Sequence, residues 1–453
     1  MLTKEKMLQT ITEFIWGVPM IVLLFGTHIF MTIRLRFIQK HVKKAIQLSV
    51  AVDDHNEGEI TQFGALATAL AATIGTGNIV GVSTAVALGG PGAVLWCWLT
   101  GVFGMATKYA EALLSVKYRT KNERGETVGG PMYVIERGLG KKWLAIVFAL
   151  FTVFATFGAG CTVQSHAITN VIDNTFAINP AISGIVVTGL TAFVVLGGVK
   201  TISSVCEKLV PFMSVFYIVG CLCILFINRE QIIPAIVLIV KSAFTKRSAF
   251  GGFVGSTLLV ACRFGVARGL FSNESGLGTA PIAAASAKTK NPVRQALVSM
   301  TGTFWDTVII CAMTGIVIVS SVLHIPNAFE GVNADALTQI AFGQLPVVGG
   351  YILAIALSIF AFTTILGWSY YGEKCMEYLF GEKSVIVYRI AFLIILYVGA
   401  IANLGIIWTF SDLMNGLMAF PNLLSLLLLS GIVVKETKYY LWENRLEETE
   451  KSK

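Results

Sequence analysis

The chain has 453 residues, of which 55% are hydrophobic and only 13% are charged, and its mean hydropathy is +0.74. This composition is too apolar for a soluble protein of that length and indicates a single integral membrane domain over residues 1–453. The net charge of +8 requires no nucleic-acid partner, because basic residues of membrane proteins gather on the cytoplasmic side.

Eleven stretches are apolar enough to cross a bilayer, which takes about 20 consecutive residues for a helix. They lie at 12–33, 61–87, 92–116, 143–169, 181–198, 203–227, 249–286, 295–322, 346–372, 385–402 and 406–434. A membrane β-barrel would instead need alternating segments of roughly ten residues, and the sequence contains none. The sequence therefore predicts an all-α integral membrane protein with 11 transmembrane helices and a cytoplasmic tail at 435–453.

The distribution of lysine and arginine predicts the orientation. With the N-terminus outside, 25 of the 34 basic residues fall on the cytoplasmic side and six on the other side. This asymmetry favours an external N-terminus and a cytoplasmic C-terminus. We expect a multi-pass protein of the plasma membrane, which in a prokaryote is the inner membrane.

Two similar motifs interrupt apolar stretches in the two halves of the chain. They are Asn78-Ile-Val-Gly81-Val-Ser-Thr84-Ala85 and Asn273-Glu-Ser-Gly276-Leu-Gly-Thr279-Ala280, and each follows a glycine- or serine-containing break. In the expected orientation one motif enters from the cytoplasm and the other from outside. Residues 61–227 and 249–434 then form inverted repeats of five helices, with 12–33 as an extra N-terminal helix. Paired broken helices are typical of the central binding site of a secondary transporter, although small residues also serve helix packing.

The first break can offer polar main-chain groups of both signs. Gly75 and Gly77 permit torsions that a helix does not use, so amides and carbonyls become free at membrane depth. Amides at the start of a half-helix suit a carboxylate. The carbonyls of Ala71 and Ile74, which close the preceding half-helix, suit a cation. This pattern favours co-transport of a carboxylated solute with a monovalent cation, and a purely structural kink is the alternative.

Three long runs resemble the alanine or glycine:cation symporter family of the amino acid–polyamine–organocation superfamily. They extend from Ala71 to Gly92, from Gly104 to Glu111 and from Gly265 to Ala284, and the resemblance continues along essentially the whole chain. The Gly-Thr-Gly-Asn break is also similar to that of neurotransmitter:sodium symporters. The resemblance implies a leucine-transporter-type fold with a 5+5 inverted repeat. It also implies uptake of small neutral amino acids, alanine and glycine, driven by sodium or, alternatively, by protons.

The expected substrate site combines both breaks with polar and aromatic residues of other spans. We expect the amides of the first break to bind the substrate carboxylate, the second break to meet its ammonium, and two aromatic rings to exclude larger side chains. The predicted substrate-binding residues are Gly75, Thr76, Gly77, Asn78, Gln164, Phe271, Ser272, Asn273, Thr364 and Trp368. Gln164 could instead serve only helix–helix hydrogen bonding.

The expected sodium site uses uncharged oxygens, which hard monovalent cations accept. Hydroxyls of the ninth span complement carbonyls of the first break. The predicted ligands are Ala71, Ile74, Phe360, Thr363 and Thr364. The alternative is that the threonine hydroxyls only bond back to their own helix.

Charges inside the spans need partners. We expect Asp306 to pair with Arg263 or Arg268, and Lys108 to form an interfacial pair with Glu111. A proton relay through Glu274 or Asp306 is an alternative to pairing.

Other classes of protein fit less well. The five histidines are scattered and no catalytic motif is present, so we expect no enzyme and no cofactor beyond sodium as coupling ion. The expected partners are a small neutral amino acid, sodium and the lipid bilayer, with the protein a monomer. A transporter of another solute with the same fold, or a channel, remains the alternative.

Overall fold

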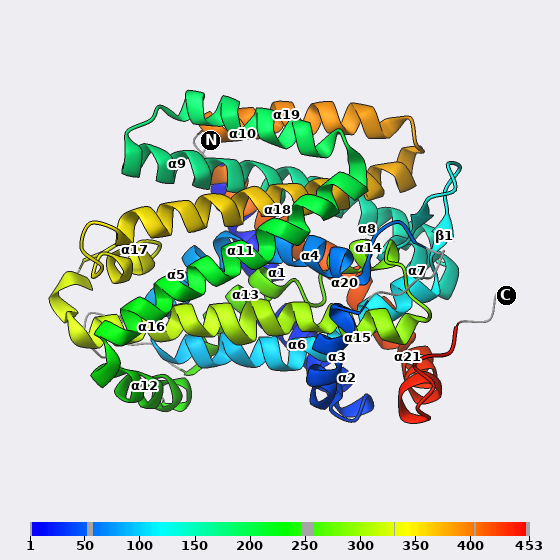
Figure 1. Cartoon of the computed structure of the whole chain (residues 1–453), viewed down its shortest axis with the longest axis horizontal. Coiled ribbons are helices and arrows are strands. Elements are labelled where there is room, and N and C mark those ends of the chain that lie inside the picture. Colours follow the sequence, from blue (N-terminus) through cyan, green and yellow to red (C-terminus); the bar gives the residue numbers. More distant parts are fainter. Residues whose placement is uncertain (1, 52–57, 246–257, 330, 403–404, 450–453) are drawn as a thin grey trace.

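The computed structural model describes residues 2–51, 58–245, 258–329, 331–402 and 405–449. Most of these residues are helical, and the longest helices run along the long axis of the molecule (Figure 1). A short hairpin, in which β1 (Thr120–Lys121) pairs antiparallel with β2 (Thr127–Val128), is the one sheet within the described ranges. The predicted all-α fold is confirmed.

The helical segments follow one another with short connections. Before the hairpin lie α1 (Leu2–Ile15), α2 (Val18–Arg34), η1 (Ile38–His41), α3 (Val42–Ser49), α4 (Gln62–Thr73), η2 (Gly77–Gly81), α5 (Val82–Gly89) and α6 (Gly92–Lys117). Between the hairpin and residue 245 lie α7 (Pro131–Leu139), α8 (Lys142–Ala155), η3 (Thr156–Thr162), α9 (Val163–Phe176), α10 (Pro180–Val195), α11 (Gly198–Ile227), η4 (Arg229–Gln231) and α12 (Ile232–Phe244).

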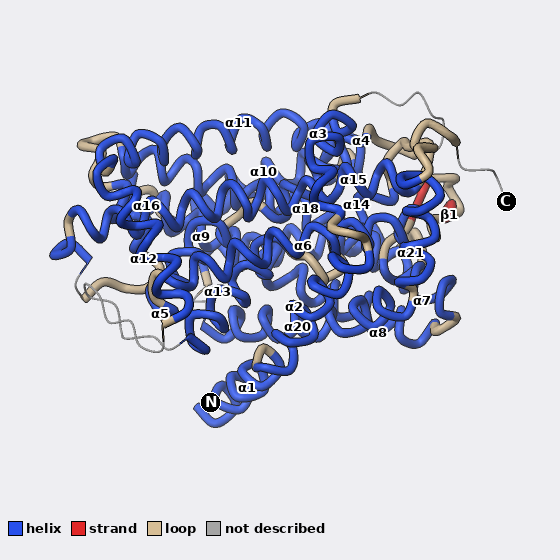
Figure 2. Tube along the Cα trace, turned by 90° about the horizontal axis from the view of Figure 1, so that it is seen from below, coloured by secondary structure: helices blue, strands red, loops and turns tan. Residues whose placement is uncertain are grey.

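The second half begins, in its described part, at residue 258. Its segments are α13 (Leu258–Asn273), α14 (Ala280–Ala285), α15 (Pro292–Thr303), η5 (Phe304–Cys311), α16 (Ala312–His324), η6 (Pro326–Phe329), α17 (Leu337–Phe342), α18 (Gly349–Phe380), α19 (Ser384–Ile401), α20 (Gly405–Leu428), α21 (Ser430–Thr437) and η7 (Lys438–Trp442). Figure 2 shows the helices packed side by side along the long axis, with α1 projecting from the bundle.

Fewer helices qualify as membrane spans than the eleven predicted. Within the described ranges, six are long and apolar enough, or eight if each of two bent pairs counts as one span. Helices nevertheless occupy every predicted stretch. Of the others, α10 has only 16 residues, and α6 contains glycines and two charged residues in its buried part. Part of the 249–286 stretch falls outside the described residues, so the count of eleven stays a prediction.

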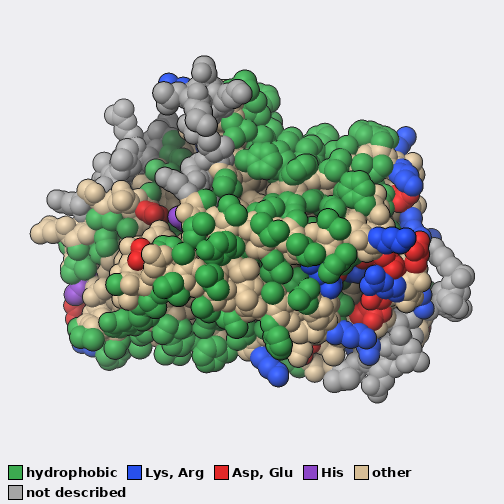
Figure 3. All heavy atoms as spheres, turned by 90° about the horizontal axis from the view of Figure 1, so that it is seen from above, with side chains coloured by type: hydrophobic (Ala, Val, Ile, Leu, Met, Phe, Trp, Pro, Cys, Tyr) green, Lys and Arg blue, Asp and Glu red, His purple; other side chains and the backbone are tan. Residues whose placement is uncertain are grey.

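The surface is divided along the long axis. Hydrophobic side chains cover most of the face in Figure 3, and charged side chains gather mainly at one end. The hairpin, α7, α14 and α21 lie at that end in Figure 1. An apolar belt with charges concentrated at one end is the pattern expected of a protein that crosses a bilayer.

Both predicted breaks are present. The axis of α4 and that of the following η2–α5 segment differ by 51°, and residues 74 and 75 between them lie outside regular helix. The second break covers residues 274–279, between α13 and α14. Glu274, Gly276 and Gly278 all have positive φ there. For Glu274 this conformation costs of order 1 kcal/mol, so surrounding contacts must hold it.

A glycine lets α18 approach the first broken helix. A Cβ atom at Gly367 would lie 2.8 Å from the nitrogen and 2.9 Å from the Cα of Ala72 in α4. Such contacts cannot be relieved by a side-chain rotation, because the neighbouring atoms belong to the main chain. Gly367 therefore sets the spacing of α4 and α18 beside the bend.

Replacing Gly367 by alanine should separate these two helices. We expect a destabilisation of about 1–3 kcal/mol, seen as a lower thermal midpoint in detergent. Gly350→Ala in the same helix is the matched control, because a Cβ there has no heavy atom within 4 Å. An equal midpoint for the two variants would contradict the close-approach argument.

Candidate functional site

A cavity lies between the two breaks. It is small, with a volume of about 20 Å³, which is room for about one water molecule. Its walls come from both breaks and from η3, α9, α18 and α20. The lining residues are Ala72, Thr73, Gly75, Thr76, Gly77, Ala159, Gln164, Phe271, Glu274, Leu277, Thr364, Trp368 and Asn415. Of the ten predicted substrate-binding residues, Gly75, Thr76, Gly77, Gln164, Phe271, Thr364 and Trp368 are among them.

Asn78 lies behind the cavity and supports the first break. Its Oδ1 accepts a hydrogen bond from the Gly75 amide at 2.9 Å, and its Nδ2 donates to Asp306 Oδ1 at 2.7 Å. The Asn78 amide itself donates to the Gly75 carbonyl at 3.3 Å. The structure therefore differs from the prediction that Asn78 faces the substrate: it satisfies a main-chain amide that the break has freed.

Asp306 connects the two breaks. It lies in η5, a π-helical turn of the kind often found at functional sites. Its carboxylate, fully buried, also accepts the hydroxyl of Thr307 at 2.5 Å and lies 3.0 and 3.1 Å from the Ser272 hydroxyl of α13. Ser272 is thus turned toward Asp306 and, like Asn78, is absent from the cavity wall.

The expected pairing of Asp306 with an arginine is wrong. Arg263 and Arg268 line a separate cavity, and Arg268 interacts electrostatically with Asp412. The basic side chain that acts on Asp306 is Lys108. The sequence gives the position of a charge along a helix but not which neighbouring helix brings its partner.

The second break is held by α6 and α20. Glu111 Oε1 accepts from the Gly276 amide at 3.0 Å and from Asn422 Nδ2 at 2.6 Å. Within the break, Asn273 Oδ1 accepts from the Ser275 amide at 2.9 Å, and Asn273 does not line the cavity. Asn273, like Ser272, therefore stabilises the break.

Lys108 and Glu111 do interact electrostatically, as predicted, but their predicted interfacial position is wrong. Both residues are 3% exposed, and Glu111 serves the main chain of the second break. The amino group of Lys108 makes no hydrogen bond within the described part of the chain. Packing of α6 against α13 and α14 places both charges in the interior.

Three of the oxygens predicted to bind sodium lie together at the first bend, although both threonine hydroxyls also bond back to their own helix. The Thr364 hydroxyl donates to the Phe360 carbonyl at 2.9 Å and lies 3.5 Å from the Ile74 carbonyl. Two oxygens that each lie about 2.4 Å from the same cation, with an oxygen–cation–oxygen angle of about 90°, are about 3.4 Å apart. The distance between the Thr364 hydroxyl and the Ile74 carbonyl is close to this value. Thr363 donates to Phe360 at 3.0 Å and contacts Met213 Sδ at 3.3 Å. Ala71 lies one turn before Ile74, so these residues fit a cation of this type.

A larger cavity adjoins the central one. It holds about 1130 Å³ of open space and is lined by α1, α13 and α20, including Trp16, Arg268 and Asp412. Phe271 lines both cavities. Phe271 is therefore shared by the two cavities.

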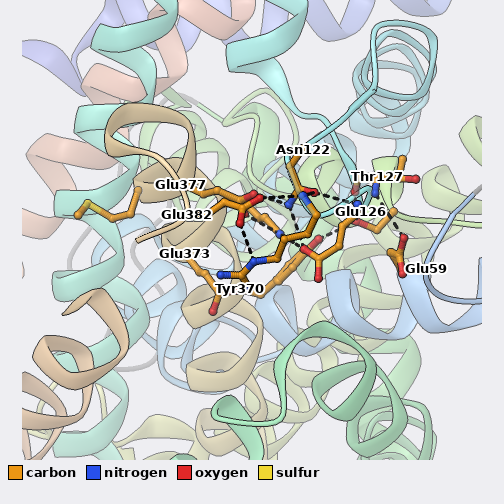
Figure 4. Close-up of polar contacts among 12 residues, drawn as sticks. Glu59, Asn122, Glu126, Thr127, Tyr370, Glu373, Glu377 and Glu382 are labelled. Atoms are coloured by element: carbon orange, nitrogen blue, oxygen red, sulfur yellow. Dashed lines mark hydrogen bonds and ion pairs between the residues drawn. The ribbon is translucent and has the colours of Figure 1, made fainter. Parts of the chain in front are cut away.

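An ionic network joins the hairpin to α18 and α19 at the charged end (Figure 4). Arg389 of α19 forms a bidentate pair with Glu373 of α18, at 2.7 and 3.0 Å. Asn122 donates to Glu377 at 2.6 Å, and further pairs link the same elements. These are Arg124 with Glu382 at 2.6 Å, Lys374 with Glu377 at 2.7 Å and Lys374 with Glu126 at 3.6 Å. The network fastens the hairpin over this end of the helices.

Sequence reasoning missed several lining residues. The polar ones are Thr73, Glu274 and Asn415, and all three line the central cavity. A signal for Asn415 was present, because an isolated polar residue within an apolar span is a functional candidate by default. The apolar lining residues, such as Leu277, carry no such signal.

This fold, with a cavity between two broken helices, defines a class of protein: a secondary membrane transporter. The chain belongs to the sodium:alanine symporter family, whose model matches residues 1–453. It is a sodium-coupled amino-acid symporter of the plasma membrane, with sodium as the coupling ion.

Relatives agree along nearly the whole chain. It is 50% identical over 442 residues to the sodium/alanine symporter AgcS of Methanococcus maripaludis, covering 96% of this chain and 97% of that protein. The amino-acid carrier protein AlsT of Bacillus subtilis is 35% identical over 437 residues, covering 95% and 90%. Among solved structures, MhsT in complex with L-phenylalanine matches with a TM-score of 0.56 at 14% identity, over 84% of this chain and 98% of that one. The predicted leucine-transporter-type fold is confirmed.

Replacing Asp306 by asparagine should loosen both breaks. The variant removes the charged acceptor of Asn78 and Ser272, and hydrogen bonds to charged groups are worth about 1.5–3 kcal/mol. We expect a lower thermal midpoint and at least tenfold slower sodium-driven amino-acid uptake. Ser320→Ala in α16 is the control, since its hydroxyl bonds only to Val317 of its own helix. Wild-type stability and uptake in Asp306→Asn would refute this role.

Replacing Arg389 by alanine should favour opening at the charged end. A shift of about 1 kcal/mol in that equilibrium changes populations about fivefold. Cys375, buried beside Lys374, should then react about fivefold faster with a maleimide, as followed by mass spectrometry. Arg445→Ala, which removes an exposed pair with Glu443, should leave the rate unchanged. Unaltered labelling in Arg389→Ala would show that the network does not close this end.

Proposed function

We propose that the protein imports alanine and glycine together with sodium by alternating access. The observation that supports this most directly concerns Thr364. Its side chain lines the central cavity, and its hydroxyl lies beside the Ile74 carbonyl of the cation group. A residue shared by the two sites lets the occupancy of one change the affinity of the other.

In this proposal the first break binds the substrate carboxylate. The amides of Thr76 and Gly77 open the outer half-helix, where the partial positive charge of a helix N-terminus favours an anion. Phe271 and Trp368 bound the space left for the side chain. A cavity this small favours the smallest amino acids, alanine and glycine, over bulky ones, and it must widen to admit either.

Sodium binds to uncharged oxygens at the bend. The carbonyls of Ala71, Ile74 and Phe360 and the hydroxyls of Thr363 and Thr364 supply the ligand set. Binding there holds α4 against α18 and so favours the bent form of the first broken helix. The substrate then meets a formed site, which lowers the ordering cost of its binding.

Alternating access follows from the two closures. Phe271 separates the central cavity from the larger one, and the ionic network of Figure 4 closes the other end. We propose that the charged end is cytoplasmic, with the N-terminus outside, because lysine and arginine concentrate there. The inverted repeats 61–227 and 249–434 would exchange roles between the two states, within a monomer in a prokaryotic inner membrane.

The test is uptake of radiolabelled alanine and glycine into proteoliposomes under imposed gradients. A sodium gradient should drive saturable uptake, and a proton gradient alone should not. Thr364→Val keeps the side-chain volume but loses the hydroxyl, so the sodium concentration for half-maximal uptake should rise about tenfold, equivalent to about 1.4 kcal/mol.

Ser369→Ala in the same helix is the matched control, because that hydroxyl bonds only to Leu366. Uptake that follows the proton gradient, or a Thr364→Val variant with the wild-type sodium dependence, would overturn the assignment.

A further inference from the structure

The central cavity contains buried acceptor oxygens that the protein leaves without donors. Gln164 Oε1 and Asn415 Oδ1 are both buried with no hydrogen-bond partner among the described residues, and both residues line the cavity. An unsatisfied buried acceptor costs about 1–3 kcal/mol. Two of them facing one small cavity indicate that a ligand supplies the missing donors.

The chemistry of its neighbours fixes the orientation of Gln164. Its Nε2 lies 3.0 Å from the Ala159 carbonyl, which can only accept a hydrogen bond, and 3.2 Å from the Thr76 hydroxyl. The remaining atom of the amide must therefore be the oxygen. Asn415 is 1% exposed. No carbonyl or hydroxyl of the described structure fixes the orientation of its amide, so the amide oxygen can point into the cavity.

A carboxylate lies in the same cavity. Glu274 is 2% exposed, and its Oε2 accepts the Thr279 hydroxyl at 2.6 Å. Lys108 acts on Glu274 electrostatically. Among the described ion pairs, none involves Glu274, and Lys108 does not line the cavity. The cavity thus holds a buried carboxyl group with no ion-pair partner among the described residues.

We propose that Gln164, Asn415 and Glu274 form the receptor for the α-ammonium group of the substrate. This inference rests on the proposed function and deepens it. An ammonium brings three donors and one positive charge, which matches three acceptors of which one is charged. A water molecule offers two donors and no charge. The ammonium is then held mainly by side-chain acceptors, whereas the amides of the first break are donors to the carboxylate.

Specificity follows from this arrangement. Each N–H of the substrate has its own acceptor, so removing one leaves a buried oxygen without a partner. Glycine, N-methylglycine and N,N-dimethylglycine share a carboxylate and differ in having three, two and one N–H donors. The series therefore counts the acceptors in use.

The experiment measures how well these three compounds compete with labelled alanine for sodium-driven uptake by the full-length protein in proteoliposomes. For the wild type we expect about tenfold weaker competition for each N–H removed, which corresponds to about 1.4 kcal/mol. In Asn415→Leu, which has a similar volume and no acceptor, glycine should compete about tenfold less well. Its advantage over N-methylglycine should largely disappear.

Controls separate this effect from general damage. Ser411 lies one turn before Asn415 on α20 and does not line the cavity. The Ser411→Ala variant should therefore show the wild-type order of competition by the three compounds. Asn415→Ala replaces the leucine variant if that protein is not monodisperse, and Glu274→Gln should weaken competition by all three compounds. Absence of alanine uptake by the wild type would instead refute the proposed function itself.

Two results would overturn the ammonium receptor. One is an unchanged series in both Asn415→Leu and Glu274→Gln. The other is a changed sodium dependence of uptake in these variants with the methylglycine series intact, which would show that the three oxygens hold a cation or water.

Discussion

Main-chain groups released from a helix inside a bilayer must find polar partners within the protein, because lipid offers none. Side chains buried in the interior meet this requirement at both breaks. The Asp306 carboxylate accepts hydrogen bonds from Asn78 of one broken helix and from Ser272 of the other. The Glu111 carboxylate accepts one from the Gly276 amide. Two carboxylates, carried by helices that are not themselves broken, thus hold the irregular chain in place.

The cavity is a consequence of this support. Several polar side chains of the two breaks form hydrogen bonds outside the cavity wall. The glycines and main chain of the breaks are therefore left to line the space between them. Two glycines then allow close packing: a Cβ at Gly367 would meet Ala72 of α4, and a Cβ at Gly160 would meet the Trp368 side chain. Three π-helical turns, η2, η3 and η5, surround the site. Each adds a residue to a turn and so shifts the side chains that follow it.

Much of this arrangement could be predicted from the sequence. The glycine-containing motifs located both breaks, because few other residues accept those torsions. Gln164, Thr364 and Trp368 were predicted at the cavity and line it. Asn78, Ser272 and Asn273 were predicted to bind substrate, but they are not among the residues that line the cavity. Their direction depends on partners such as Asp306, which is 228 positions from Asn78 and whose contacts no local pattern encodes. The same limit explains the wrong pairing of Asp306 with an arginine and the missed Asn415.

The central claim is that irregular main chain from two broken helices binds the substrate. An experimental structure determined with sodium and alanine tests it most directly. The account predicts density for alanine between residues 75–77 and Glu274, with a cation beside Ile74 and Thr364. Continuous α-helix through residues 74–76 and 274–279, or alanine bound elsewhere with this cavity empty, would contradict it.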